Sequence, residues 1–312
     1  MPKYYLIPKR TARAWPRLEK VFLWSEALLF RMIFTVVRLL PLECASRLLG
    51  LLFRLLGPFS GKTARIRANL TIAFPEMGEP EQSKTVRDIY SHLGTSVAEL
   101  LHMPKIWEQW AQRIDYEVDP EALSYLENGP AGVYVTAHVG AWQVAPIPLI
   151  RAHLKAPMAM VYAPEGNPYL HDLFYPLREA IGVKVIASKS GVRPLMKELG
   201  SGTSLALAVD TRLASGKLIP FFGVETLTNT TPARLALRNG GPLVPVLSQR
   251  VAPGRFKVHV QRPISPRIPD ASIDDAAVDM TAQVNDCFEE WIRATPGQWL
   301  CLKRRWPKSN RL

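Results

Sequence analysis

Short apolar runs alternate with longer helical patterns between residues 131 and 261, and this alternation constrains the chain more than any other feature. The runs are rich in β-branched and apolar residues and have the length of buried strands: residues 133–137, 158–163, 183–187, 204–209, 243–248 and 255–261. Helical patterns over residues 142–154, 168–181 and 192–199 separate the first four runs. The sequence therefore predicts an α/β fold with a mostly parallel sheet flanked by helices.

His138 directly follows the first of these strands, and Gly140 loosens the backbone before the next helical pattern. Open α/β sheets bind ligands at the carboxyl ends of their strands, and an imidazole at that edge suits a general base. Asp210 and Arg212 follow the strand at 204–209 in the same way, so parallel pairing brings them to the same edge. We predict a site around His138, in which Arg212 either holds a phosphate or forms an ion pair with Asp210.

The N-terminal third combines basic and apolar residues. Residues 1–20 carry one acid, Glu19, against Lys3, Lys9, Arg10, Arg13, Arg17 and Lys20. Residues 21–59 are apolar, but charges and Pro41 interrupt them before any window reaches the roughly 20 uncharged residues of a spanning helix. We predict two amphipathic helices in the membrane interface, within a membrane-associating region 1–60 that precedes an α/β domain 61–312. A buried helical hairpin and a spanning helix over residues 21–40 are the alternatives.

Two more helices are predicted, over residues 61–77 and 81–103. In the first, Arg65 and Arg67 either contact phosphates or lie on a solvated face. In the second, the apolar residues form a core stripe, so His92 and His102 are interpreted as structural. The cysteines Cys44, Cys287 and Cys301 lack the spacing of a zinc site or disulfide framework, which fits a reducing compartment.

Two apolar or aromatic segments near the C-terminus each allow two interpretations. The run 218–223, with Phe221 and Phe222, lines a pocket for an acyl chain or packs in the core. The tail from residue 294 places tryptophans beside lysines and arginines, which suits lipid headgroups or an anionic substrate. The formal charge of +12 also favours an anionic partner. No nucleic-acid-binding motif accompanies this charge, so a nucleic-acid partner is not expected.

Six blocks, in this order, resemble the bacterial lipid A biosynthesis acyltransferase family over about residues 20–306. They are Arg-Ala-Asn-Leu-Thr-Ile-Ala-Phe-Pro-Glu at 67–76, the His138 block, Val-Asp-Thr-Arg at 209–212, Pro-Phe-Phe-Gly at 220–223, Pro-Ala-Arg-Leu-Ala at 232–236, and the Trp-rich block 296–306. Glycerophosphate-type acyltransferases are a poorer match, because no Phe-x-Glu-Gly-Thr-Arg block follows the histidine.

The resemblance implies transfer of a fatty acyl group from a thioester of acyl carrier protein or coenzyme A to a hydroxyl of a glycolipid or phospholipid acceptor. It implies an enzyme at the cytoplasmic face of a bacterial inner membrane, with no metal or cofactor. His138 would then be the general base. The residues expected to bind substrate, from the matching blocks, are Arg67, Asn69, Trp142, Arg212, Phe221 and Phe222.

One departure from the family pattern matters for the chemistry. The family places Asp or Glu five residues after the histidine, where this chain has Gln143, which carries no charge. Asp210 or Glu165 would have to supply the missing carboxylate. In the tail, Gly297, Cys301 and Lys303 replace the glutamate, tryptophan and histidine that are usual there. Two functions follow: an active O-acyltransferase, or a catalytically degenerate relative that binds lipid or acyl carrier protein as an accessory component.

Overall fold

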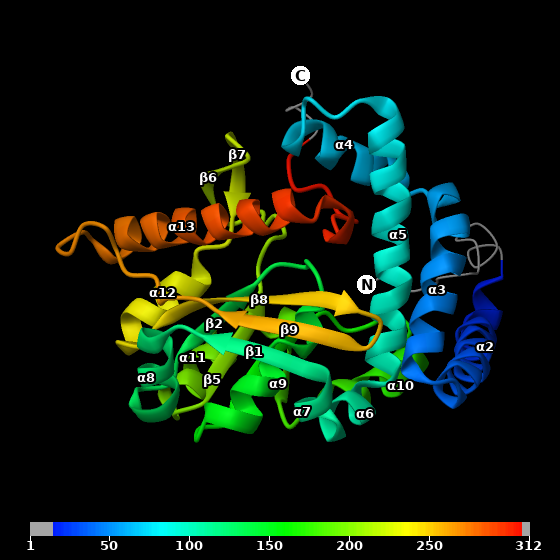
Figure 1. Cartoon of the computed structure of the whole chain (residues 1–312), viewed down its shortest axis with the longest axis horizontal. Helices are drawn as coiled ribbons and strands as arrows, with labels where there is room; N and C mark the ends of the chain where they lie inside the picture. Colours follow the sequence, from blue (N-terminus) through cyan, green and yellow to red (C-terminus); the bar gives the residue numbers. More distant parts are fainter. Residues whose placement is uncertain (1–14, 308–312) are drawn as a thin grey trace.

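A computed structural model describes residues 15–307 of the chain (Figure 1). Its centre is a seven-stranded sheet in the order β1-β9-β8-β2-β5-β3-β4. The six predicted strands are all present, with ends that shift by a few residues. The strands are β1 (Ile114–Val118), β2 (Val133–Thr136), β3 (Met158–Tyr162), β4 (Lys184–Ala187), β5 (Ser204–Ala208), β8 (Leu243–Ala252) and β9 (Arg255–Val260). Of these, β1 was not predicted.

The sheet is parallel except at one pair. Strands β8, β2, β5, β3 and β4 run in the same direction, whereas β9 is antiparallel to β8 and pairs in parallel with β1. Buried side chains form a core on each face of this sheet. The predicted α/β fold with a mostly parallel, helix-flanked sheet is therefore confirmed.

The helices follow the predicted order. They are α2 (Glu19–Leu39), α3 (Leu42–Leu56), α4 (Thr63–Ala73), α5 (Glu79–Leu101), α6 (Met103–Glu108), α7 (Trp110–Arg113), α8 (Pro120–Asn128), α10 (Pro168–Glu179), α11 (Arg193–Gly200), α12 (Thr231–Asn239) and α13 (Ile273–Ala294). The continuous helix expected over 142–154 is instead three short pieces: a 3-10 turn Trp142–Val144, α9 (Pro146–Pro148) and a π-helical turn Leu149–His153. Pro146 and Pro148 lack the backbone N–H that a regular helix needs.

Helices α2, α3 and α5 lie side by side at one end of the sheet (Figure 1). The chain breaks between α2 and α3 at Pro41, as predicted. Helix α3 crosses α5 so closely that a Cβ on Gly94 would lie 2.2 Å from the Leu49 carbonyl oxygen. One side of the α2–α3 pair is buried against α5 and α10 through residues that include Phe34, Leu101 and Leu177.

The opposite side of this pair is apolar and exposed. It carries Val21, Trp24, Leu28, Leu29, Met32, Ile33, Val36, Leu39, Leu48, Leu51, Leu52, Leu55 and Leu56, and Phe59 follows in the 3-10 turn Gly57–Phe59. The α2–α3 hairpin is therefore buried on one side only. The spanning alternative fails, because no helix within residues 15–307 is both long and apolar enough to cross a bilayer. Of the basic residues predicted near the start, Lys3, Lys9, Arg10 and Arg13 lie outside the described residues.

A separate hairpin and the C-terminal segment cover the core on the α13 side of the sheet. The hairpin consists of β6 (Lys217–Phe221) and β7 (Val224–Thr228), with Phe222 at φ 52° and Gly223 at φ 71° in its turn. Trp299 and Trp306 are each 1% exposed and pack against Phe221 and Phe222. The interpretation of these tryptophans as contacts for headgroups is therefore wrong: they belong to the core.

Candidate active site

The backbone around His138 is held from both sides. After β2, Gly140 adopts φ +59°, and a Cβ at this position would lie 2.1 Å from the Ser248 carbonyl oxygen of β8. Ala141 N–H donates to that same oxygen at 2.8 Å, and Leu300 N–H donates to the His138 carbonyl at 2.9 Å. Only glycine satisfies both the left-handed conformation and the close approach. The turn therefore fixes the position from which the His138 side chain extends.

His138 and Asp210 form a hydrogen-bonded pair at the sheet edge, as expected from two strands that end side by side. Strand β5 neighbours β2, and the Asp210 Oδ1 lies 2.5 Å from the His138 Nδ1. The second carboxylate oxygen of Asp210 accepts a hydrogen bond from Trp299 Nε1 at 3.1 Å. The Asp210 side chain is 3% exposed and the His138 side chain 31%. The carboxylate is thus buried, and each of its oxygens has a hydrogen-bond partner, whereas the imidazole reaches solvent.

The charges of the pair follow from this geometry. Burial lowers the pKa of His138, but the charge of Asp210 and its hydrogen bond outweigh burial and the nearby Lys303, so the pKa is raised. Burial raises the pKa of Asp210, but His138 and the Trp299 N–H outweigh it, so that pKa is lowered. Asp210 is therefore ionised, and the His138 Nδ1 carries the shared proton. No described residue hydrogen-bonds Nε2, which is free to accept a proton.

The residue at the family's carboxylate position does not take part in this pair. The Gln143 Oε1 is buried and has no hydrogen-bond partner within residues 15–307. Glu165, the other carboxylate expected near His138, lies instead against Arg178 at 2.9 Å and His171 at 3.7 Å. Of the two predicted carboxylates, the structure therefore places Asp210 at His138 and not Glu165.

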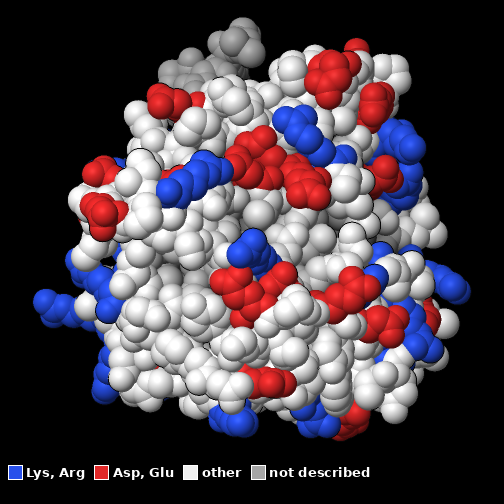
Figure 2. Space-filling model, turned by 60° about the vertical axis from the view of Figure 1, so that its left-hand side comes forward, with Lys and Arg blue, Asp and Glu red and all other residues white. Residues whose placement is uncertain are grey.

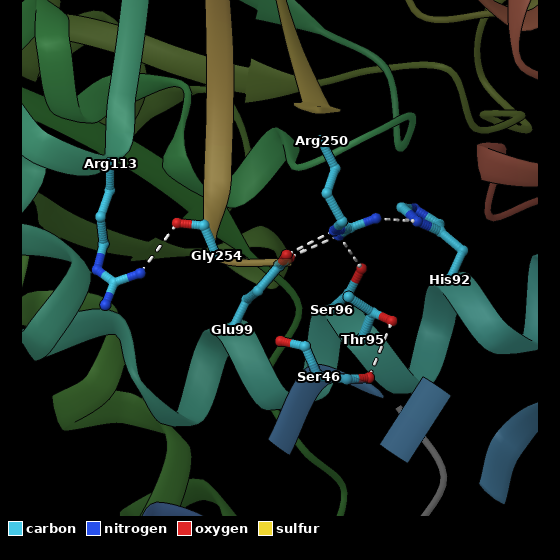
Figure 3. Close-up of polar contacts among 8 residues, drawn as sticks. All are labelled: Ser46, His92, Thr95, Ser96, Glu99, Arg113, Arg250 and Gly254. Atoms are coloured by element: carbon cyan, nitrogen blue, oxygen red, sulfur yellow. Dashed lines mark hydrogen bonds and ion pairs between the residues drawn. The ribbon is translucent and has the colours of Figure 1, made fainter. Parts of the chain in front are cut away.

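The ring of Trp142 connects His138 to a buried polar cluster. Its centroid lies 5.3 Å from the imidazole of His138 and 6.2 Å from that of His92. Figure 3 shows Arg250 of β8 extending toward α5, where it meets His92, Ser96 and Glu99. We call Arg250, Glu99, His92 and Ser96 the Arg250 cluster. Two hydrogen bonds of 2.5 Å join the Arg250 guanidinium to the Glu99 carboxylate, and a third, of 2.6 Å, reaches the His92 Nδ1.

The other predicted site residues form no hydrogen bond or ion pair with His138 or Asp210. Arg212 is exposed, and no described residue forms an ion pair with it, so the expected pair with Asp210 is absent. Arg67 donates to Gln82 at 2.9 Å and Ser83 at 2.8 Å.

Asn69 is buried and binds the C-terminal segment. Its Nδ2 donates to the Cys301 and Lys303 carbonyls at 2.9 and 2.7 Å, and its Oδ1 accepts from the Arg305 N–H at 2.9 Å. Phe221 and Phe222 lie in the aromatic core described above. The structure thus gathers His138, Trp142 and Asp210 at one place, while Asn69, Phe221 and Phe222 support the segment that carries Trp299.

Trp299 was not predicted to contact Asp210. It lies 89 residues from its partner along the chain, and its only signal in the sequence is membership of the C-terminal block.

Within residues 15–307, no group of three or more His, Cys, Asp or Glu side chains is arranged to hold a metal ion. The site at this sheet edge consists of an imidazole, a carboxylate bonded to its Nδ1 and an indole bonded to the carboxylate, an arrangement in which an imidazole can act as a general base.

Comparison with known proteins identifies the family to which the chain is similar. Residues 16–308 match the family of bacterial lipid A biosynthesis acyltransferases. A phosphatidylinositol mannoside acyltransferase of Mycobacterium tuberculosis is 29% identical over 58% of this chain, and the match spans 56% of that relative's length. The lipid A biosynthesis lauroyltransferase of Escherichia coli is 27% identical over 77% of each chain.

The crystal structure of a 1-acyl-sn-glycerophosphate acyltransferase from Thermotoga maritima overlaps 80% of this chain and 97% of its own. The sequence identity is 15% and the TM-score 0.38, at which the likeness carries no conclusion. The family match, in contrast, covers nearly the whole sequence and includes His138 and Asp210. The chain therefore belongs to the bacterial lipid A biosynthesis acyltransferase family.

Proposed function

We propose that this protein is a membrane-associated O-acyltransferase that moves a fatty acyl group from a thioester of acyl carrier protein or coenzyme A to a hydroxyl of a glycolipid. The single observation that carries the proposal is the His138–Asp210 pair, in which Nδ1 is bound to a carboxylate and Nε2 is free. Family membership supports the reaction class, and the names of the relatives support a lipid-like acceptor.

The reaction assigns each group a role. The acceptor hydroxyl donates its proton to the His138 Nε2 while its oxygen attacks the thioester carbonyl carbon. The Asp210 carboxylate stabilises the imidazolium that forms, and the C–S bond breaks as the tetrahedral intermediate collapses. The imidazolium then returns the proton to the departing thiolate, so the products are an ester and a free thiol.

The positive charge of the chain supports an acidic donor. The formal net charge is +12, and both acyl carrier protein and coenzyme A are anionic. The side chain of Lys303 lies close enough to influence the pKa of His138, and Arg212 is exposed on the same sheet edge. These cations are our candidates for contacts with the donor phosphates.

Purified protein, incubated with acyl carrier thioesters or acyl-CoA and a glycolipid acceptor, should form an acylated product that mass spectrometry detects. His138→Ala should lower the rate by about 10²–10⁴-fold, the scale of a lost general base. Lipid binding without turnover in the wild-type protein would instead identify the degenerate accessory protein that Gln143 first suggested.

The exposed apolar residues of α2 and α3 support contact with a membrane, and the family resemblance supports the cytoplasmic face of a bacterial inner membrane. Monomeric proteins rarely expose one contiguous apolar surface of this kind, and amphipathic helices bury such a face among lipid headgroups. Arg31, Arg38 and Arg47 lie on these two helices, where they would reach anionic headgroups. This placement brings the enzyme to its lipid acceptor.

Vesicle binding tests this placement. Leu51 and Leu55 are 55% and 60% exposed, so replacing both with glutamate should weaken binding to phospholipid vesicles by at least about tenfold. Ile268 and Ile273 are also exposed, at 68% and 50%, but lie outside α2 and α3. Replacing both with glutamate is the matched control, and equal weakening in the two double variants would contradict a specific membrane face.

A further inference from the structure

A buried arginine lies close to Asp210 without touching a carboxylate. Arg305, in the C-terminal segment, is 2% exposed. Its Nη1 donates to the Leu227 carbonyl at 3.1 Å and its Nη2 to the Thr228 hydroxyl at 2.7 Å, and its Nε is buried without a partner within residues 15–307. No described carboxylate forms an ion pair with it. Burial lowers the pKa of Arg305 to about 10 and the charge of Asp210 opposes this shift, so the guanidinium is charged at neutral pH.

The guanidinium is fixed between the β6–β7 hairpin and the aromatic core. It lies over the ring of Phe221, 4.7 Å from the centroid, and the Arg305 carbonyl accepts a hydrogen bond from the Thr226 hydroxyl at 2.7 Å. Phe221 also packs against Trp299, with the ring centroids 6.2 Å apart. Because the Trp299 indole donates to Asp210, one phenyl ring and one indole connect the buried cation to the buried carboxylate.

Asp210 also lacks a cation in direct contact. Its side chain is 3% exposed, and its two oxygens are bound to the His138 Nδ1 and the Trp299 Nε1. Both partners are uncharged as long as His138 is neutral. A buried charge is costly unless an opposite charge compensates it. The same core therefore encloses one cation and one anion, and neither has a directly bonded counter-ion.

The other charged groups around this core are less well placed to compensate these two charges. Figure 2 shows acidic and basic side chains close together on one face of the molecule, where water and salt screen them. Lys303 is exposed, and Arg293 and Glu289 of α13 are 53% and 20% exposed and lie 3.7 Å from each other. Glu225 is exposed on the side of β7 opposite to Thr226. The two buried charges are therefore best compensated by each other.

We propose that Arg305 is the counter-ion of Asp210 and, given the proposed function on which this role rests, a positioning residue for His138. The absence of direct contact has a chemical reason. An arginine in contact with a carboxylate occupies its oxygens, as Arg250 does with Glu99 (Figure 3). Arg305 compensates the charge of Asp210 through the aromatic core and leaves both oxygens to the imidazole and the indole.

A double-mutant cycle on the full chain tests the counter-ion without any need for turnover. Urea unfolding gives the equilibrium constant of unfolding for Arg305→Gln, for Asp210→Asn and for the double variant. Alone, Arg305→Gln leaves the anion uncompensated, whereas with Asp210→Asn it removes a cation that has lost its counter-ion. We expect Arg305→Gln to raise the unfolding constant at least about fivefold more in the wild-type background than in Asp210→Asn. Equal effects in the two backgrounds would overturn the proposal.

A second measurement leaves Arg305 in place, so it does not require an Arg305 variant to fold. Asp210→Asn should lower the pH at which the guanidinium carbon of Arg305 titrates by about 0.5–1 pH unit, the scale of one charge beyond direct contact. Carbon-13 NMR follows this titration. Glu225→Gln is the matched control, because it removes a carboxylate on the other side of β7, and it should leave the titration unchanged. An unchanged titration in Asp210→Asn would contradict the counter-ion.

Two variants separate the charge of Arg305 from its hydrogen bonds. Arg305→Lys keeps the charge, whereas Arg305→Gln keeps a donor for Thr228 and carries no charge. The kcat for acyl transfer should fall at least about tenfold in Arg305→Gln, a fraction of the roughly 10⁴-fold loss that follows removal of an orienting carboxylate, and less in Arg305→Lys. Equal losses in the two variants would show that Arg305 only holds the C-terminal segment.

The counter-ion and the proposed function can fail independently. Coupling between Arg305 and Asp210 in a protein without acyl transfer would reject the proposed function and keep the counter-ion. Acyl transfer in a protein whose double-mutant cycle is additive would reject the counter-ion and keep the function.

Discussion

Two histidines neighbour the ring of Trp142, and their surroundings give them opposite properties. His138 donates from Nδ1 to a carboxylate, and its pKa is raised because Asp210 outweighs the effect of burial. His92 is 4% exposed and accepts at Nδ1 from the Arg250 guanidinium, and burial, followed by that positive charge, lowers its pKa well below the ordinary value. In the Arg250 cluster the carboxylate of Glu99 binds the arginine instead of the imidazole.

The comparison shows that the hydrogen-bond partner of a histidine determines its protonation state. A directly bonded carboxylate gives His138 one protonated nitrogen and one free nitrogen near solvent, which is the state a general base requires. An arginine between carboxylate and imidazole favours the neutral form of His92. We therefore expect a substitution of Asp210 to lower the rate of acyl transfer, and a substitution of Arg250 to lower the free energy of unfolding.

The largest expected effect is at Asp210. Asp210→Asn removes the charge that orients His138, and the corresponding change in serine proteases lowers kcat by about 10⁴-fold. We expect a loss of about 10³–10⁴-fold in acyl transfer, and the acidic limb of the pH–rate profile should move to lower pH as the raised pKa of His138 relaxes. Glu165→Gln is the control, because that buried carboxylate binds Arg178, and it should leave the limb in place. An unaltered rate in Asp210→Asn would remove the distinction between the two histidines.

Arg250→Met should lower the free energy of unfolding by about 3–5 kcal/mol, because it leaves the Glu99 carboxylate, 3% exposed, without its counter-ion. Urea unfolding measures this loss, and kcat of the folded variant should change far less than in Asp210→Asn. Arg262→Met breaks a pair with Glu121 whose arginine is 78% exposed, and it should cost less than about 1 kcal/mol. Similar losses in both variants would show that the Arg250 cluster is no stronger than a surface pair.

The two histidines should also give stability opposite dependences on pH. Because the pKa of His92 is lowered, the unfolded chain binds its proton first, so stability falls as pH drops below 6.5. The pKa of His138 is raised, so its contribution is full below 6.5 and is lost as pH rises through the higher folded value. Urea unfolding between about pH 5 and pH 8 measures the free energy of unfolding. Each histidine should change this free energy by at most about 1.4 kcal/mol per pH unit. His92→Asn should flatten the acidic side alone; a flattened alkaline side would contradict the assignment.

The smallest effect is expected at Gln143. Since Asp210 already orients His138, Gln143→Glu should change kcat by less than about tenfold. This limit corresponds to about 1.4 kcal/mol in the activation free energy. The same acyl transfer assay measures it. A larger loss would indicate that the uncharged amide has a role of its own beside the imidazole.

The site was partly predictable because the sequence shows where strands end, although it does not show their order in the sheet. His138 and Asp210 follow β2 and β5, which pair directly, so a shared sheet edge was enough to bring them together. Glu165 follows β3, which lies beyond β5, and the helix that begins after it presents Arg178 to the carboxylate. The sequence shows that each residue follows a strand, but the order of the strands is a property of the fold.

The unpredicted elements lack the local signals on which prediction depends. Strand β1 lies at the edge of the sheet, and its Asp115, Tyr116 and Glu117 are exposed, so it has no alternating apolar pattern. The β6–β7 hairpin turns at Phe222 and Gly223, both at positive φ, where an Asn-Gly pair is the usual signal. The contact of Trp299 with Asp210 depends on Asn69 and the hairpin holding a distant segment in place.

The position of Trp299 has a consequence for the order in which the enzyme becomes competent. During synthesis on the ribosome, His138 and Asp210 emerge well before the indole that completes the hydrogen bonds of the carboxylate. A nascent chain that stops short of residue 299 would carry both members of the pair and leave one oxygen of Asp210 without its donor. Such a chain should therefore hold Asp210, and with it the imidazole of His138, less firmly than the full chain does.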